Sequence, residues 1–232
     1  MENNFIKLLL LLVLIIGCTS VDVLSEGQNS DKSNNSNAYV NPTSKGGIWI
    51  YIDSLNIDSL LIKVPTELIL WDSEDRLSWL DFLGEIQFKS KYKAKTFSKI
   101  NFENTVSKDS IILKIPCFFV SNKSWVKNDF RENLLLLEHE QLHFDIAELV
   151  ARKIREECAQ HESTSLLESS VILQKIYDKF YGDFWDELNF AYDEETNHGI
   201  NEGKQLEWEF KVKNELKLLK RYSSIIVVIP RL

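Results

Sequence analysis

Apolar residues are spaced differently in the two halves of this chain. From Gly46 to Lys127, short runs of β-branched and aromatic residues are separated by polar, turn-forming stretches, which is the pattern of short strands. From about Phe130 to Gln160, apolar residues recur at helical spacing with no Gly or Pro between them. A sheet-forming part followed by packed helices predicts an α+β fold that is mostly β in its N-terminal part.

Individual elements follow from the same pattern. The β-prone runs are Ile48–Ile52, Leu60–Val64, Ser110–Ile115, Cys117–Val120 and Ile225–Ile229. The expected helices are about Phe130–Gln160, Ser163–Tyr192 with a break near Gly182, and Glu202–Tyr222. Asn128 or Asp129 is the expected cap of the first helix. Pro116, between two of the β-prone runs, favours an edge strand or a bulge.

The N-terminus carries a different signal. Lys7 precedes Leu8–Ile16, an unbroken apolar run that is shorter than the roughly 20 residues needed to span a bilayer but suits a signal peptide. The run ends in Gly17-Cys18, which looks like a bacterial lipobox, where the cysteine is lipidated and becomes the mature N-terminus. We expect residues 1–17 to be a lipoprotein signal peptide and Cys18 to carry the membrane anchor. An ordinary signal peptide or a short membrane anchor is the alternative.

Residues 18–45 are polar and hold too few apolar side chains to fold, so they are expected to be a flexible tether. Residues 46–232 then form a single domain. This organisation places the domain in the cell envelope, on the periplasmic or cell-surface side of a membrane. Such a compartment permits a disulfide, and the sequence leaves open whether Cys117 and Cys158 pair or remain buried thiols.

The charge of the chain excludes one class of partner. Asp and Glu number 35 against 27 Lys and Arg, which gives a net charge of −8. Nucleic-acid-binding proteins need clustered Lys and Arg, and the sequence has no such cluster. We therefore expect no nucleic-acid partner.

The strongest chemical signal is His139-Glu140-Gln141-Leu142-His143, an HExxH motif inside the first expected helix. Helix positions four apart share one face, so His139 and His143 can bind one Zn²⁺ ion. Glu140 is turned by about 100° from His139, beside the metal rather than on it. There it can act as the catalytic base toward a zinc-bound water. A chance match on an amphipathic helix is the alternative, but the motif holds two of only four His in the chain.

A catalytic zinc needs a third protein ligand and an open position. Asp145 and Glu148 lie on the far side of the helix, and Glu148 is spaced to pair with Arg152. His198, in a turn-like stretch before Gly199, is the expected third ligand. The remaining candidates are the carboxylates of Asp193, Glu194 and Glu195.

Tyr192 is a candidate oxyanion donor, because a phenol near a zinc site can stabilise developing negative charge. The alternative is a packed aromatic residue. Trp79, Trp125, Trp185 and Trp208 are expected in the core.

These motifs resemble the bacterial domain-of-unknown-function 922 family. The resemblance covers roughly residues 65–215. Its most specific block is Leu136–Leu149 followed by Ala151-Arg152-Lys153; weaker blocks are Thr196–Gly199 with Gln205 and Trp208, Ser124–Val126 and Trp79–Phe82. The resemblance implies a zincin-like, zinc-dependent peptidase with His139 and His143 as ligands and Glu140 as base, and it supports His198 as third ligand. Leu142 departs from the small residue common in the family.

The sequence thus predicts a zinc metallopeptidase that acts on a peptide or protein substrate and is held to a membrane through Cys18. Zincins bind peptide along an edge strand near the metal helix, and Ile111–Val120 is the expected strand. Two alternatives stay open. The chain could be a non-catalytic envelope lipoprotein with a structural zinc site, or a zinc hydrolase of a non-peptide amide.

Overall fold

The computed structural model describes residues 49–51, 67–162 and 165–231. They belong to one compact unit that begins at Gly47. Sheets and helices are both present, and all the strands except the last precede the long helices in the described chain, so the α+β class is confirmed. The predicted signal peptide, Cys18, the tether and the run Leu60–Val64 lie outside the described residues. None of the described helices is long and apolar enough to cross a membrane.

One sheet has the strand order β1-β5-β6-β9. Its strands are β1 (Trp49–Tyr51), β5 (Glu103–Val106), β6 (Ser110–Lys114) and β9 (Ile226–Pro230). β1 runs parallel to β5, and the other pairs are antiparallel. The last strand of the chain thus pairs with a strand from its first half, which brings the C-terminal segment back onto the core.

A second sheet has the order β2-β7-β4, and a separate two-stranded ladder joins β3 to β8. The strands are β2 (Leu68–Leu70), β3 (Ala94–Lys95), β4 (Ser98–Ile100), β7 (Cys117–Val120) and β8 (Trp125–Val126). All these pairs are antiparallel. β7 is buried along its whole length, because it lies between two strands and under a helix.

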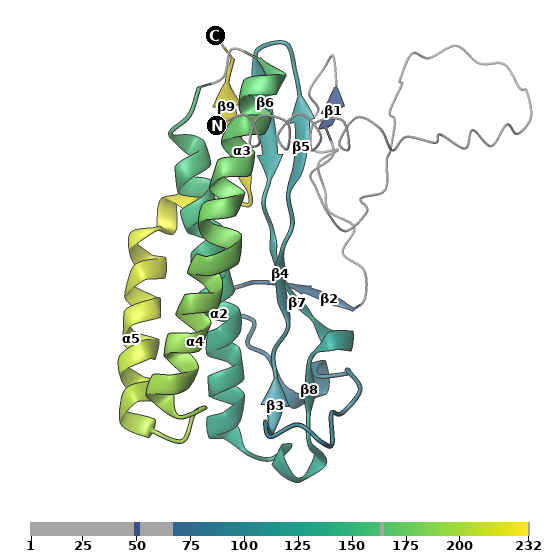
Figure 1. Cartoon of the computed structure of the whole chain (residues 1–232), viewed down its shortest axis with the longest axis vertical. Helices are drawn as coiled ribbons and strands as arrows, with labels where there is room; N and C mark the ends of the chain where they lie inside the picture. The colour runs from purple at the N-terminus through teal and green to yellow at the C-terminus, as the bar shows by residue number, and fades with distance from the viewer. Residues whose placement is uncertain (1–48, 52–66, 163–164, 232) are drawn as a thin grey trace, which may run out of the picture. The chain divides into compact units, whose positions relative to one another are not determined.

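Helix α2 (Leu134–Ala159) is the centre of the fold and is buried on two sides. One side, with Phe144, Val150 and Ile154, packs in the main core against β4, β7 and β9. The other side, with Leu142 and Ile146, packs in a second core against α4 and α5. Figure 1 shows α2 running between the strands and these outer helices. A helix enclosed in this way holds its side chains in fixed positions.

The remaining helices are α3 (Leu166–Lys179), α4 (Trp185–Thr196) and α5 (Glu202–Leu218). A π-helical turn, Phe180–Phe184, joins α3 to α4, and Gly182 has a non-helical backbone there (φ −96°, ψ −107°). The break predicted near Gly182 is therefore confirmed. Short 3₁₀ turns are Trp79–Asp81, Ser121–Lys123, Asn128–Phe130 and Lys220–Tyr222.

Two details of the predicted elements are wrong. The first helix is capped by Asn133, whose side chain accepts from the Leu136 amide, because Asn128 and Asp129 form a separate 3₁₀ turn. The second helical stretch continues past Tyr192 to Thr196. Its end is set by Asn197, whose left-handed backbone (φ 49°) closes the last turn.

The prediction that Ile111–Val120 forms an exposed edge for substrate is also wrong. β6 lies between β5 and β9, and β7 lies between β2 and β4, so both edges of each strand are already paired. The chain crosses from one sheet to the other at Ile115-Pro116, where the Ile115 amide donates to Ile225 and the Pro116 carbonyl accepts from Asn101. Cys117 and Cys158 are free thiols, both buried.

Buried charges anchor the C-terminal half of α2. Arg155 is fully buried and donates to Glu148 at 2.8 Å, to the Ile115 carbonyl at 2.7 Å and to the Tyr222 carbonyl at 3.0 Å. Glu148 also accepts from Arg152 at 2.9 Å, the pair predicted from their spacing. This network joins the helix to the segment between β6 and β7 and to the segment before β9.

Replacing Arg155 by Ala should lower the free energy of unfolding by about 3–5 kcal/mol, because Glu148 would lose one of its two buried partners. Lys153→Ala is the matched control on the same helix, since Lys153 pairs with Glu215 near the surface and should cost less than about 1 kcal/mol. Urea denaturation of both variants measures the difference. Equal effects would contradict a structural role for the buried network.

Candidate metal centre

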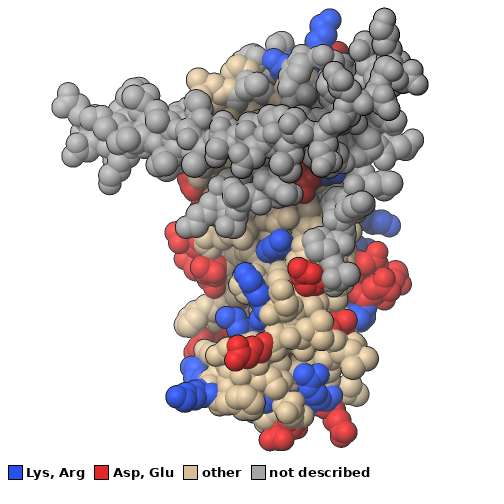
Figure 2. All heavy atoms as spheres, turned by 90° about the vertical axis from the view of Figure 1, so that its right-hand side faces the viewer, with Lys and Arg blue, Asp and Glu red and all other residues tan. Residues whose placement is uncertain are grey.

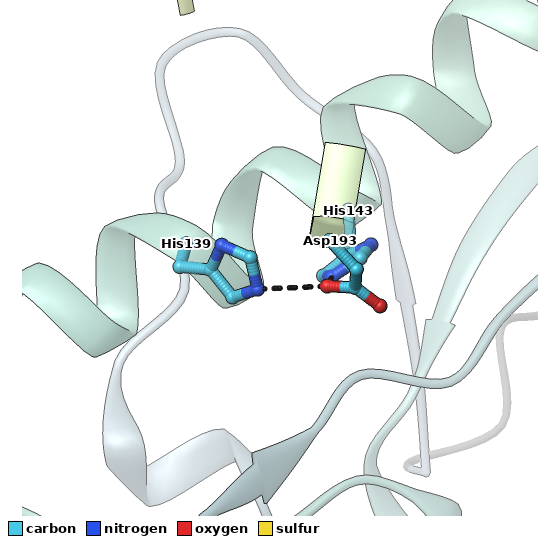
Figure 3. Close-up of side chains that lie close together, drawn as sticks. All are labelled: His139, His143 and Asp193. Carbon is cyan, nitrogen blue, oxygen red and sulfur yellow. Dashed lines mark hydrogen bonds and ion pairs between the residues drawn. The ribbon is translucent and has the colours of Figure 1, made fainter. Parts of the chain in front are cut away.

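The two histidines of the HExxH motif point the same way from α2. Their ring centroids lie 4.8 Å apart, and Figure 3 shows both rings directed toward Asp193. His139 is buried, and its side chain is only 3% exposed, whereas that of His143 is 16% exposed. The spacing of the motif therefore does bring two imidazoles to one place, as predicted from the helix period.

Asp193, on α4, completes the group. Its Oδ1 atom lies 3.1 Å from Nε2 of His139 and 3.1 Å from Nε2 of His143. Ligand atoms bound to a tetrahedral zinc at about 2.0–2.1 Å lie about 3.3 Å from one another, so these separations fit one face of such a site. Among the described residues, these three side chains are the one group of three or more His, Cys, Asp or Glu residues that could hold a metal ion. Their ligand atoms all lie within 4.8 Å of one another.

Two carboxamides fix the orientation of the imidazoles. Asn189 Oδ1 lies 2.8 Å from Nδ1 of His143, and Asn189 Nδ2 donates to the Trp185 carbonyl, which settles which end of the amide faces the ring. Gln205 Oε1 lies 3.3 Å from Nδ1 of His139, and its Nε2 donates to Glu209. Amide oxygens at both Nδ1 atoms select the tautomer with Nδ1–H and leave Nε2 free to bind a metal.

Without a cation, neutral imidazoles cannot form all the hydrogen bonds for which this cluster has partners. Each imidazole faces an amide oxygen at Nδ1 and the Asp193 carboxylate at Nε2, yet a neutral imidazole carries one N–H. Filling both positions by protons makes two imidazolium rings with centroids 4.8 Å apart, and like charges so close together repel. A divalent cation between the Nε2 atoms and Asp193 satisfies all three groups at once. The residues present therefore fit a bound metal.

The electrostatics agree with this arrangement. Burial lowers the pKa of His143, but the hydrogen bond to Asp193 and the charges of Glu140 and Asp193 outweigh burial, so the net pKa is raised. Burial raises the pKa of Asp193, but the hydrogen bonds from His139 and His143 hold it well below its usual range. Asp193 is thus ionised at neutral pH and available as a ligand.

Glu140 is placed as the motif predicts, beside the cluster and not in it. The side chain is buried, and its Oε2 atom has no hydrogen-bond partner among the described residues. Its charge is close enough to His143 to raise the pKa of that imidazole. A buried carboxylate oxygen without a partner is costly, and a water held at an adjacent metal would supply the missing hydrogen bond.

His198 lies next to the cluster without belonging to it. Its Nδ1 atom is 3.4 Å from Asp193 Oδ1, and its side chain is 35% exposed, the most of the four residues. The turn that carries it contains Gly199 at φ +80°, and a Cβ there would meet Cβ and Cγ of His139 at 3.0 Å. Gly199 thus lets the turn approach the metal helix, but the structure groups Asp193, not His198, with the two motif histidines.

Tyr192 is a packed aromatic residue, which is the alternative to the predicted oxyanion donor. The side chain is fully buried, and its hydroxyl donates to Gln205 at 2.7 Å and lies 3.2 Å from the His139 carbonyl. Its ring stacks on His139 with centroids 4.6 Å apart. Burial raises the pKa of Tyr192, so it stays protonated. It positions His139 and has no exposed face toward a substrate.

Glu194 and Glu195 are the other carboxylate candidates, and the structure separates both from the cluster. Glu194 is exposed, and Glu195 accepts from Trp208 Nε1 at 3.0 Å. Sequence reasoning missed Asn189, although its position four residues before Asp193 places both on one helix face.

Of the tryptophans expected in the core, Trp79, Trp125 and Trp208 are buried, and Trp185 is partly buried.

No family model, no curated protein and no solved structure matches the chain. The resemblance to the domain-of-unknown-function 922 family therefore stays a prediction, as does the zincin-like fold. On the face in Figure 2, acidic and basic side chains of the described residues are interspersed.

Replacing Gly199 by Ala should weaken metal binding at least about tenfold, because the new Cβ meets His139 and the backbone is strained at φ +80°. Gly203→Ala is the matched control, since its Cβ would meet nothing closer than Asn201 Oδ1 at 3.6 Å. Zinc titration by calorimetry compares the two. If both variants bind zinc as the wild type does, the close approach of the turn is unimportant to the site.

Lowering the pH should release the metal, because protons compete for the Nε2 atoms. The raised pKa of His143 places the onset of this competition above the ordinary value of 6.5. Zinc affinity should therefore already fall before the pH has dropped to 6.5, and the metal-free protein should take up protons over the same range. Affinity measured at several pH values tests this, and a constant affinity over the whole range contradicts it.

Proposed function

We propose that this chain is a zinc-dependent metallopeptidase, exported and held to the cell envelope through a lipid anchor at Cys18. The observation that carries the proposal is the cluster of His139, His143 and Asp193, together with the carboxylate oxygen of Glu140 that has no hydrogen-bond partner among the described residues. Three protein ligands leave a fourth position open, which is the arrangement of catalytic and not of structural zinc sites.

Asp193 is the third zinc ligand in this proposal, in place of His198. The distances support this assignment. Asp193 Oδ1 lies 3.1 Å from the Nε2 atoms of both motif histidines, whereas Nδ1 of His198 lies 3.4 Å from the same oxygen. Carboxylate oxygens bind zinc at about 2.0–2.2 Å, as histidine nitrogens do at about 2.0–2.1 Å. Small side-chain shifts would therefore convert the present separations into a coordinated set.

Each residue has a separate task in the reaction. Zinc bound here supplies Lewis acidity and lowers the pKa of a water to about 7. Glu140 accepts a proton from the attacking water and passes it to the leaving amine nitrogen. Asn189 and Gln205 hold the two imidazoles through their Nδ1 atoms, so the ligands are in place before a metal or a substrate binds.

A peptide substrate has a strand edge available near Glu140. β3 pairs only with β8 in the described part of the chain, and β4 pairs only with β7. Thr96, between β3 and β4, donates its hydroxyl to the Glu140 carbonyl at 3.0 Å, so this segment runs directly beside the metal helix. An extended peptide can add to such an edge through main-chain hydrogen bonds. In this proposal the peptide binds along this edge and not along Ile111–Val120.

The rival proposal is a closed structural zinc site with His198 as fourth ligand. The 3.4 Å approach of its Nδ1 atom to Asp193 favours it. A closed shell would leave no position for water and no task for Glu140.

Zinc content separates the ligand sets. The purified chain should bind about one zinc, and Asp193→Ala should lower its affinity by roughly 100-fold or more, because a ligand is lost. His198→Ala should keep the zinc. Loss of zinc in His198→Ala but not in Asp193→Ala would overturn the assignment of the third ligand.

Glu140→Gln tests catalysis apart from metal binding. The variant should retain zinc and its fold but lose cleavage of a mixed peptide library, followed by mass spectrometry, by about 100-fold or more. Glu138→Gln is the matched control, because Glu138 is exposed on the same helix. A Glu140→Gln protein that cleaves as well as wild type, or a wild type with zinc and no cleavage, would favour the structural site.

A further inference from the structure

His198 contacts a second exposed ring on the open side of the cluster. The His198 and Tyr92 rings meet edge to face with centroids 5.1 Å apart. Tyr92 is 41% exposed, and its phenol has no hydrogen-bond partner among the described residues. His139 and His143 are far more buried than His198. The pair therefore lies where the cluster meets solvent.

The two rings come from opposite sides of the metal helix. Tyr92 lies in the segment that leads into β3, which pairs only with β8 among the described strands. Lys127 fixes that segment by donating to the Ser90 carbonyl at 2.6 Å. His198 lies in the turn between α4 and α5. Their contact joins the segment before β3 to the turn between α4 and α5.

The turn that carries His198 is held in an unusual conformation. Asn197, His198 and Gly199 all have positive φ, at 49°, 53° and 80°. Left-handed backbone is uncommon and strained for a non-glycine residue, and it occurs often at functional sites. Thr196 braces the turn, because its hydroxyl accepts from the Gly199 amide at 3.3 Å and donates to the Tyr192 carbonyl at 2.7 Å.

We propose that His198 and Tyr92 form a substrate-contact pair that binds the peptide next to the metal, and that His198 is not a zinc ligand. This inference rests on the proposed function. Nδ1 of His198 lies 3.4 Å from Asp193 Oδ1, which leaves Nε2, on the other edge of the ring, to contact a peptide. The Tyr92 phenol offers a second hydrogen-bonding group and an apolar ring face.

Two hydroxamates distinguish contact with the metal from contact with the peptide. Acetohydroxamate reaches little beyond the metal, whereas a tripeptide hydroxamate extends along the site. In the zinc-loaded chain, His198→Ala and Tyr92→Ala should keep about one zinc and bind acetohydroxamate as wild type does. Both should bind the tripeptide hydroxamate about tenfold more weakly, because only that probe reaches the pair.

Controls match each ring. His161→Ala replaces a histidine outside the cluster, and Tyr177→Ala replaces a tyrosine on α3 that is also 41% exposed. Neither should change the affinity of either probe. Tyr92→Phe separates the phenol from the ring: a loss as large as that of Tyr92→Ala assigns the contact to the hydroxyl.

Three results would overturn the inference, and they are distinguishable. Loss of zinc in His198→Ala makes His198 a ligand. Unchanged affinity for the tripeptide hydroxamate in both variants, with zinc and acetohydroxamate binding intact, removes the pair from the substrate site and leaves the proposed function standing. A wild-type protein that binds zinc but neither hydroxamate has no open coordination position, and the proposed function fails with the inference.

Discussion

One carboxylate oxygen organises the candidate metal centre. Asp193 Oδ1 lies 3.1 Å from the Nε2 atoms of His139 and His143, whose Nδ1 atoms already face the amide oxygens of Gln205 and Asn189. The two amide oxygens hold the rings on the side away from Asp193, so the rings cannot turn away from the carboxylate. Three helices must meet for this: α2 supplies the imidazoles, α4 supplies Asp193 and Asn189, and α5 supplies Gln205.

The packing around α2 explains how such an arrangement stays in place. One side of the helix is buried against the strands, and the other is buried against α4 and α5 through Leu142, Ile146, Tyr192 and Trp208. Dense packing on both sides leaves little freedom for rotation or sliding. Tyr192 belongs at once to this apolar core and to the site, since its ring stacks on His139 and its hydroxyl bonds to Gln205. The second core and the candidate metal centre therefore share a residue and support each other.

The sequence predicts the parts of the site that depend on local spacing. His139, Glu140 and His143 follow from the helix period alone. Asp193 is only one of several candidates at that level, because the predicted helix ends at Tyr192 and places Asp193 in a loop. The helix in fact continues to Thr196, which puts Asn189, Tyr192 and Asp193 on one face. The same holds for the strands. β3, β4 and β8 are only two or three residues long, and β3 and β4 contain polar residues, so they carry little local pattern. Which strand has a free edge is a property of the assembled sheets, and Ile111–Val120 supplies central strands instead.

Charge balance gives a reason for the use of carboxamides behind both imidazoles. A divalent cation would be neutralised by Asp193 and Glu140 together, so the occupied site has no net charge. Carboxylates in place of Asn189 and Gln205 would add negative charge to a buried region, at a high desolvation cost. Amide oxygens orient the rings without that cost. They also donate less electron density to the ligands than carboxylates do, which leaves a bound metal a stronger Lewis acid toward water.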